Sequence, residues 1–108
     1  MPRQLQPAQV SEALAGSPPA LLLDVRELWE AATARIAAPA QRLIPMGEIP
    51  GRVSELDPAQ PIVVYCHHGM RSLQVVAFLE RQGFESVYNL AGGIDAWSLE
   101  VDPSVPRY

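Results

Sequence analysis

Two kinds of hydrophobic pattern alternate along this chain, and together they predict an α/β domain. Continuous apolar runs are typical of strands buried on both faces of a parallel sheet, and they occur at 20–25, 61–65 and, less strongly, 86–90. Segments with helical spacing lie between and around them, at 6–15, 27–34, 72–82 and 94–99. Strands that alternate with helices in this way predict a parallel sheet with helices on both faces.

Weaker signals complete the outline. Leu43 and Ile44 read as a short strand that Pro45 stops, and 48–56 as a short helix weakened by Pro50 and Gly51. In the segment 72–82, Leu73, Val76 and Ala77, continued by Leu79–Glu80, give the helix its apolar face, and Gly83 ends it. We expect one domain over 1–108, with an N-terminal segment and helix at 1–16 and an irregular tail at 101–108.

Composition narrows the class of protein. The chain has 108 residues and a hydrophobic fraction of 48%, which suits one soluble globular domain. No run approaches the roughly 18–20 apolar residues of a membrane span, and the start lacks the apolar core of a signal peptide. One cysteine fits a reducing compartment, so we expect a cytoplasmic protein that does not interact with membranes.

Charge removes further function classes. The net charge of −4, without a basic block, argues against nucleic-acid binding. All eight basic residues are arginine, and the absence of lysine removes Schiff-base chemistry and a phosphate-loop lysine. A single cysteine and two adjacent histidines argue against a closed Cys/His zinc site, so neither a metal nor a cofactor is expected.

The candidate chemistry lies in the segment Cys66-His67-His68-Gly69-Met70-Arg71-Ser72. It places the only thiol where a buried strand ends and a helix begins, so loop N–H groups and the helix dipole both favour an anion. A thiol held there should ionise more readily than a free one. Gly69 lets the loop turn inward, and Arg71 adds positive charge, so the arrangement reads as a nucleophile site.

Three segments in order resemble the rhodanese (thiosulfate sulfurtransferase) family. The cysteine loop matches its C-x-x-G-x-R-S, Asp24-Val25-Arg26 with Glu30 looks like its D-V-R-x-x-x-E, and the segment 90–97 looks like its L-x-G-G-x-x-A-W. The resemblance runs from about Leu21 to Trp97. One departure is the segment 35–40, which lacks the His and Gly of the family's H-I-x-G-A.

The resemblance implies a rhodanese-like fold and a two-step sulfur transfer without a cofactor. The Cys66 thiolate takes the sulfane sulfur of thiosulfate or a persulfide donor, and the resulting persulfide gives it to cyanide or a thiol acceptor. The residues expected to bind substrate or stabilise the loop are His67, His68, Gly69, Met70, Arg71 and Ser72. The tail 101–108 is similar to the ends of rhodanese domains fused behind adenylating enzymes, which implies a sulfur-carrier protein or an adenylating enzyme as partner.

Several roles stay open at this stage. His67 and His68 are expected to project outward from the rim, where they attract anions, rather than to act as a general base. Arg71 either forms an ion pair that anchors the loop or faces the substrate. For Asp24, Arg26 and Glu30 a structural network near the site is favoured over a catalytic set, and the side chains of Trp29 and Trp97 are expected to be buried or half-buried.

Two other functions compete with sulfur transfer. Some phosphatases of the same fold use Cys-x5-Arg, and an arsenate reductase would use the same loop for an oxyanion. Here Cys66 and Arg71 form the shorter Cys-x4-Arg, which suits one sulfur atom better than a tetrahedral anion. A non-catalytic rhodanese-like interaction module is the second alternative, but such modules commonly lack the cysteine.

Overall fold

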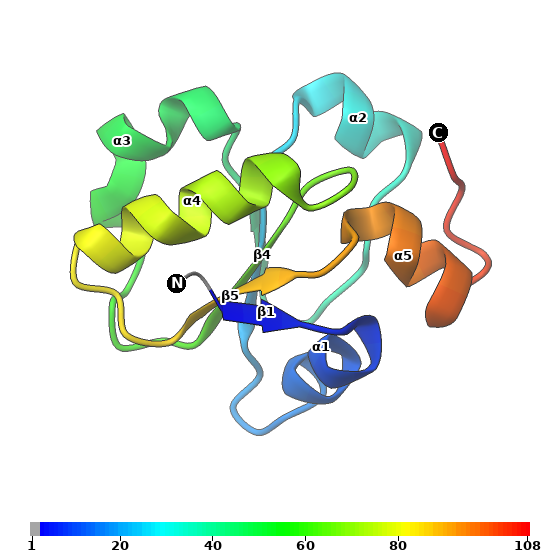
Figure 1. Ribbon diagram of the computed structural model, residues 1–108, viewed down its shortest axis with the longest axis horizontal. Coiled ribbons are helices and arrows are strands. Elements are labelled where there is room, and N and C mark those ends of the chain that lie inside the picture. Colours follow the sequence, from blue (N-terminus) through cyan, green and yellow to red (C-terminus); the bar gives the residue numbers. More distant parts are fainter. Residues whose placement is uncertain (1–2) are drawn as a thin grey trace.

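A parallel sheet forms the centre of the molecule. The structure is a computed structural model that describes residues 3–108. The strands are β1 (Arg3–Leu5), β2 (Leu21–Asp24), β3 (Gln41–Leu43), β4 (Ile62–Tyr65) and β5 (Val87–Leu90). They lie in the order β1-β5-β4-β2-β3, and every pair is parallel (Figure 1).

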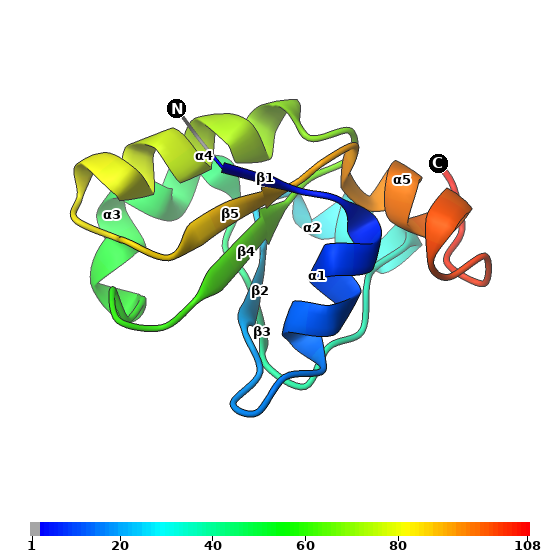
Figure 2. The same ribbon diagram turned by 60° about the horizontal axis from the view of Figure 1, so that its bottom comes forward.

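Helices cover both faces of this sheet. α1 (Pro7–Leu14) and α5 (Gly93–Glu100) lie on one face, and α3 (Ile49–Arg52) and α4 (Met70–Arg81) on the other (Figure 2). α2 (Leu28–Thr33) follows the carboxyl end of β2. The predicted parallel sheet with helices on both faces is therefore confirmed. Among residues 3–108, no helix is long and apolar enough to cross a bilayer.

Strand periodicity divides the core in two. Successive side chains of a strand point to opposite faces, so Leu23 and Val64 pack in the core beneath α3 and α4, whereas Leu22 and Val63 pack beneath α1 and α5. Both central strands, β2 and β4, are buried at every position. This explains why their sequences are continuous apolar runs rather than alternating ones.

The element boundaries differ from the predicted ones in several places. β1 lies within the predicted N-terminal segment and was not expected as a strand, because its two polar residues, Arg3 and Gln4, give no apolar run. Only β5 pairs with it, so it is an edge strand that needs little burial. β3 begins two positions before the predicted strand, at Gln41, and ends at Leu43. The predicted helix 48–56 is divided into α3 and two flanking 3-10 turns, Met46–Glu48 and Val53–Glu55.

Two predictions about side chains and one about a helix start are wrong. Trp97 is buried in the core, but Trp29 is 64% exposed, because α2 rests on the fold through Glu30 instead. α4 begins at Met70 rather than at Ser72, since Gly69 is the residue that caps it. The buried face of α4 is formed by Ser72, Val75, Val76 and Leu79. The predicted Val76 and Leu79 belong to it, whereas the predicted Leu73 and Ala77 are half-buried.

The tail 101–108 contains neither helix nor strand, as predicted, yet it is packed against the domain. Val105 is 7% exposed and belongs to the core beneath α1 and α5. The Ser98 hydroxyl donates a hydrogen bond of 2.6 Å to the Val105 carbonyl. The tail is thereby directed to Tyr108, whose ring lies near the cysteine loop.

The start of α5 is docked directly on that loop. The N–H groups of Ile94 and Asp95 donate to the carbonyls of Cys66 at 2.9 Å and His67 at 3.2 Å. Gly93 makes this approach feasible: its φ is +64°, and a Cβ there would lie 2.4 Å from the His67 carbonyl oxygen. The glycine is therefore required both by its left-handed backbone and by the closeness of the loop.

We expect Gly93→Ala to lower the free energy of unfolding by about 2 kcal/mol or more, since it combines left-handed strain with a backbone clash. The matched control is Gly47→Ala, where a Cβ would meet nothing within 4 Å. That change should be neutral or slightly stabilising. Urea unfolding of both variants measures the difference, and equal stabilities would show that the loop can move away from α5 at little cost.

Candidate active site

The Cys66 sulfur lies at the centre of a curled loop between β4 and α4. Its Sγ accepts hydrogen bonds from the Gly69 N–H at 3.1 Å and the Ser72 N–H at 3.4 Å, and the Ser72 hydroxyl oxygen lies 3.3 Å from it. Cys66 is only 1% exposed. These N–H groups, together with the partial positive charge at the start of α4, form a site that stabilises a bound anion.

The loop reaches this shape because Gly69 has a φ of +100°, which lets the chain turn inward before α4 starts. Of the residues predicted to line the site, Gly69 and Ser72 are buried and contact Sγ. Met70 is 71% exposed, and its side chain points to solvent at the rim. Of the loop N–H groups that were expected to surround the sulfur, those of Gly69 and Ser72 donate to Sγ.

Asn89 of β5 holds both of these donors. Its Oδ1 accepts a 2.5 Å hydrogen bond from the Ser72 hydroxyl, and its Nδ2 donates to the Gly69 carbonyl at 3.3 Å and to Gln4 at 2.9 Å. Asn89 is 1% exposed, so these polar contacts form away from water. The amide therefore fixes the positions of the groups that surround Sγ.

Arg71 forms an ion pair with α2. Its two terminal nitrogens donate to the two oxygens of Glu30 at 2.7 and 2.8 Å, which is the bidentate geometry of a strong pair. The Glu30 side chain is only 4% exposed. The hydrogen bonds from Arg71, followed by one from Tyr108, lower the pKa of Glu30 to about 2 despite its burial. Of the two predicted roles, anchoring of the loop is the one that the contacts display.

Asp24 and Arg26 form a second, fully buried pair at the end of β2. Arg26 donates through Nε to one Asp24 oxygen at 2.9 Å and through a terminal nitrogen to the other at 2.7 Å. Tyr65 donates its hydroxyl to Asp24 at 3.0 Å. Burial, and then the negative charge of Asp24, raise the pKa of Tyr65, which stays a donor.

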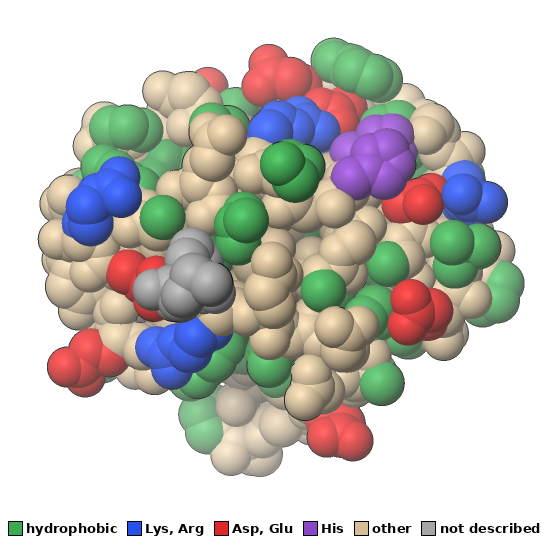
Figure 3. Space-filling model, viewed as in Figure 1, with side chains coloured by type: hydrophobic (Ala, Val, Ile, Leu, Met, Phe, Trp, Pro, Cys, Tyr) green, Lys and Arg blue, Asp and Glu red, His purple; other side chains and the backbone are tan. Residues whose placement is uncertain are grey.

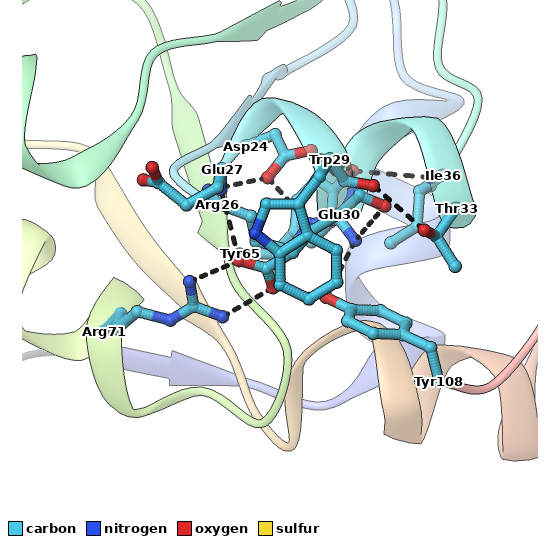
Figure 4. A network of polar contacts seen from close by, with 10 residues as sticks. All are labelled: Asp24, Arg26, Glu27, Trp29, Glu30, Thr33, Ile36, Tyr65, Arg71 and Tyr108. Carbon is cyan, nitrogen blue, oxygen red and sulfur yellow. Dashed lines mark hydrogen bonds and ion pairs between the residues drawn. The ribbon is translucent and has the colours of Figure 1, made fainter.

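Tyr108 connects the two pairs (Figure 4). Its hydroxyl accepts a hydrogen bond from Arg26 at 3.0 Å and donates one to Glu30 at 2.7 Å. Burial, and then the contact with the Glu30 carboxylate, raise its pKa to about 12. A continuous polar network therefore runs from Asp24 through Arg26, Tyr108 and Glu30 to Arg71 on the cysteine loop.

The two histidines have different surroundings. His68 is exposed, as predicted, and the pair is visible on the surface in Figure 3. His67 does not project freely outward: its ring is stacked between those of His68 and Tyr108, with both centroids at 3.9 Å. Burial, and then the neighbouring His68, lower its pKa. Within residues 3–108 the polar contacts of Sγ are with Gly69 and Ser72, and neither imidazole hydrogen-bonds to it.

The sequence is similar to those of known proteins. Residues 6–100 match the family described as the rhodanese-like domain. The chain belongs to the rhodanese family. A protein of Allochromatium vinosum named sulfurtransferase is 39% identical over 105 residues, covering 97% of this chain and 96% of its own.

Other relatives carry the domain in different contexts. The Arabidopsis thaliana protein named rhodanese-like/PpiC domain-containing protein 12, chloroplastic, is 44% identical over 93 residues, but the match spans only 30% of its length. The crystal structure of a rhodanese-related protein from Thermoplasma volcanium superposes with a TM-score of 0.82 at 31% identity, covering 98% of this chain and 99% of that one. The rhodanese-like fold is thus shared along the whole domain.

Three residues of this rhodanese domain's site were not identified from sequence. Tyr65 and Asn89 lie in the strands β4 and β5, and nothing in the sequence distinguishes them from ordinary strand residues. Tyr108 lies in a tail without periodicity. The one available signal was a polar residue inside each apolar run, because a buried polar group requires a partner.

Glu30→Gln tests the ion pair through pH. A pKa lowered from 4.5 to about 2 means that Glu30 contributes stability above about pH 4.5 and loses it as the pH falls toward 2. Wild type should therefore lose on the order of 2 kcal/mol more than Glu30→Gln between about pH 7 and pH 3. Denaturant unfolding at both pH values measures this. Glu12→Gln, at an exposed position of α1, should keep the wild-type pH dependence; if Glu30→Gln keeps it too, the pair is not stabilising.

Asn89→Ala should lower the free energy of unfolding by about 1–3 kcal/mol, because it leaves the buried Ser72 hydroxyl and Gly69 carbonyl without their partner. Gln4→Ala removes only the exposed partner of Asn89 and should cost about 0.5 kcal/mol or less. Chemical denaturation of the two variants compares them. A loss in Gln4→Ala as large as in Asn89→Ala would mean that the edge strand, not the cysteine loop, depends on this amide.

Proposed function

We propose that this protein is a sulfurtransferase that carries sulfane sulfur as a persulfide on Cys66. The observation that supports it most is the pair of backbone N–H groups, from Gly69 and Ser72, that donate to a buried, lone Sγ. Relatives named sulfurtransferase agree with it, and a Pseudoalteromonas translucida protein named thiosulfate sulfurtransferase GlpE is 44% identical over 48 residues. Thiosulfate is therefore the donor that we propose to test first.

The proposed reaction has two displacement steps. The Cys66 thiolate attacks the outer sulfur of thiosulfate; a new S–S bond forms, the old one breaks, and sulfite leaves with the electron pair. A nucleophilic acceptor, such as cyanide or a thiolate, then attacks the terminal sulfur, and Cys66 leaves as a thiolate. Gly69 and Ser72 donate to a negatively charged sulfur in both steps, so stabilisation is built into the fold before the reaction.

Arg71 weighs against the phosphatase and arsenate reductase alternatives. An oxyanion of that size would need a guanidinium that faces it. Both terminal nitrogens of Arg71 are instead occupied by a buried carboxylate. Displacing Arg71 would leave Glu30 buried without its partner, which is strongly unfavourable.

The burial of Cys66 favours a sulfur donor whose reacting end is a single terminal atom. With 1% of the residue exposed, a terminal sulfur atom fits the approach to Sγ better than a bulky group. The intact cysteine and its organised donors also weigh against the non-catalytic module, which has no use for them.

A protein is a suitable final acceptor. Three large apolar side chains are exposed on α2 and the cysteine loop: Leu28 at 70%, Trp29 at 64% and Met70 at 71%. Such side chains are favoured at protein contacts. We propose that a sulfur-carrier protein, or an adenylating enzyme that holds one, presents its acceptor group here.

Mass spectrometry of the intact protein tests the persulfide. Incubation with thiosulfate should add one sulfur atom, and cyanide should remove it with formation of thiocyanate. Cys66→Ser should show neither step, while Glu12→Gln, at an exposed position of α1, should keep persulfide formation. Turnover in Cys66→Ser would overturn the mechanism, and hydrolysis of an aryl phosphate by wild type would return the phosphatase to consideration.

A further inference from the structure

A second group of chemically active side chains lies beside the cysteine loop. The fold brings Asp95, in the first turn of α5, next to His67 and His68. One ligand atom from each of the three lies within 4.8 Å of the other two. The sequence argues only against a closed zinc site built from Cys66 and the two histidines. Asp95 is distant from them along the chain, and the fold brings it close.

We propose that His67, His68 and Asp95 form a binding site for a zinc-like divalent transition metal. Two imidazoles and one carboxylate are a ligand set that zinc takes in proteins, and three protein ligands leave a fourth position open. This is an open site at the rim, unlike the closed Cys/His site that the sequence argued against.

The backbone holds two of the three ligands in place. The Asp95 N–H donates to the His67 carbonyl at 3.2 Å, so α5 and the cysteine loop cannot separate without losing that bond. His67 is additionally fixed by the Tyr108 ring, which stacks on it at 3.9 Å. The site is therefore largely organised before any ion arrives.

His67 also has an unsatisfied atom. Its Nε2 is buried and has no hydrogen-bond partner within the described residues. Buried polar atoms without a partner are rare and unfavourable, and a cation that reached this nitrogen would supply the missing interaction.

Binding requires small movements that the surroundings permit. Zinc–ligand distances of about 2.0–2.2 Å require ligand atoms that lie well within the 4.8 Å that bounds the three here. The stacked His68 ring is exposed and can rotate toward the ion, and the Asp95 carboxylate can turn from its 2.8 Å contact with Arg107. Arg107 therefore competes with a cation for Asp95.

This competition allows a sharp test by calorimetric titration with zinc chloride. The titration uses a Cys66→Ser background, because a thiolate would itself bind zinc. We expect one zinc per chain in that background, binding weakened by about tenfold or more in His68→Ala and in Asp95→Asn, and tighter binding in Arg107→Ala, which frees the carboxylate and removes a positive charge.

The results of these titrations test the metal site independently of sulfur transfer. Zinc binding that disappears with the thiol, or that is unchanged by His68→Ala or by Asp95→Asn, would overturn the site. Binding in Arg107→Ala no tighter than in the background would overturn the role of Asp95. Because Cys66→Ser cannot form a persulfide, none of these results depends on whether the sulfurtransferase proposal is correct.

Discussion

A carboxylate that is almost fully buried needs a cation, and in this protein Glu30 finds it in Arg71 across the gap between α2 and the cysteine loop. The pair ties the rim of the loop to the sheet, since Glu30 also contacts Tyr108 and, through it, the Asp24–Arg26 pair. Removing Arg71 would leave the Glu30 carboxylate, whose side chain is 4% exposed, without its cation. The loop therefore has one favourable position, and the donors around Sγ are fixed along with it.

The same loop is fixed from the opposite side by backbone contacts. The first turn of α5 donates to the carbonyls of Cys66 and His67, and Gly93 lets it come close enough to do so. Further along the same loop, the N–H groups of Gly69 and Ser72 donate to the sulfur. Charge pairing on one side and backbone hydrogen bonding on the other thus produce a single anion-binding geometry.

The sequence predicts those features of the fold whose pattern lies within one continuous segment, and it does not predict those that depend on a contact between distant segments. The buried strands β2 and β4 were predicted because all their side chains lie inside, which the apolar runs express directly. The edge strand β1 was missed because its partner, β5, is far along the chain and a single ladder leaves it half polar. For Arg71, the position was predictable from the loop, but its partner on α2 was visible only in the folded chain. Tyr108 and Asn89 escaped notice because a polar residue shows its partner only in three dimensions.

The enclosure of Cys66 also bears on oxidative damage. A thiolate that reacts readily with sulfur donors is also a target for peroxides, and oxidation past the sulfenic acid is irreversible in most proteins. A sulfinic group carries two oxygen atoms, and each would have to enter the space where Gly69 and Ser72 already contact a single sulfur. The enclosed position of Cys66, with Gly69 and Ser72 in contact with its sulfur, therefore leaves little room for the added oxygen atoms of the irreversible oxidised forms.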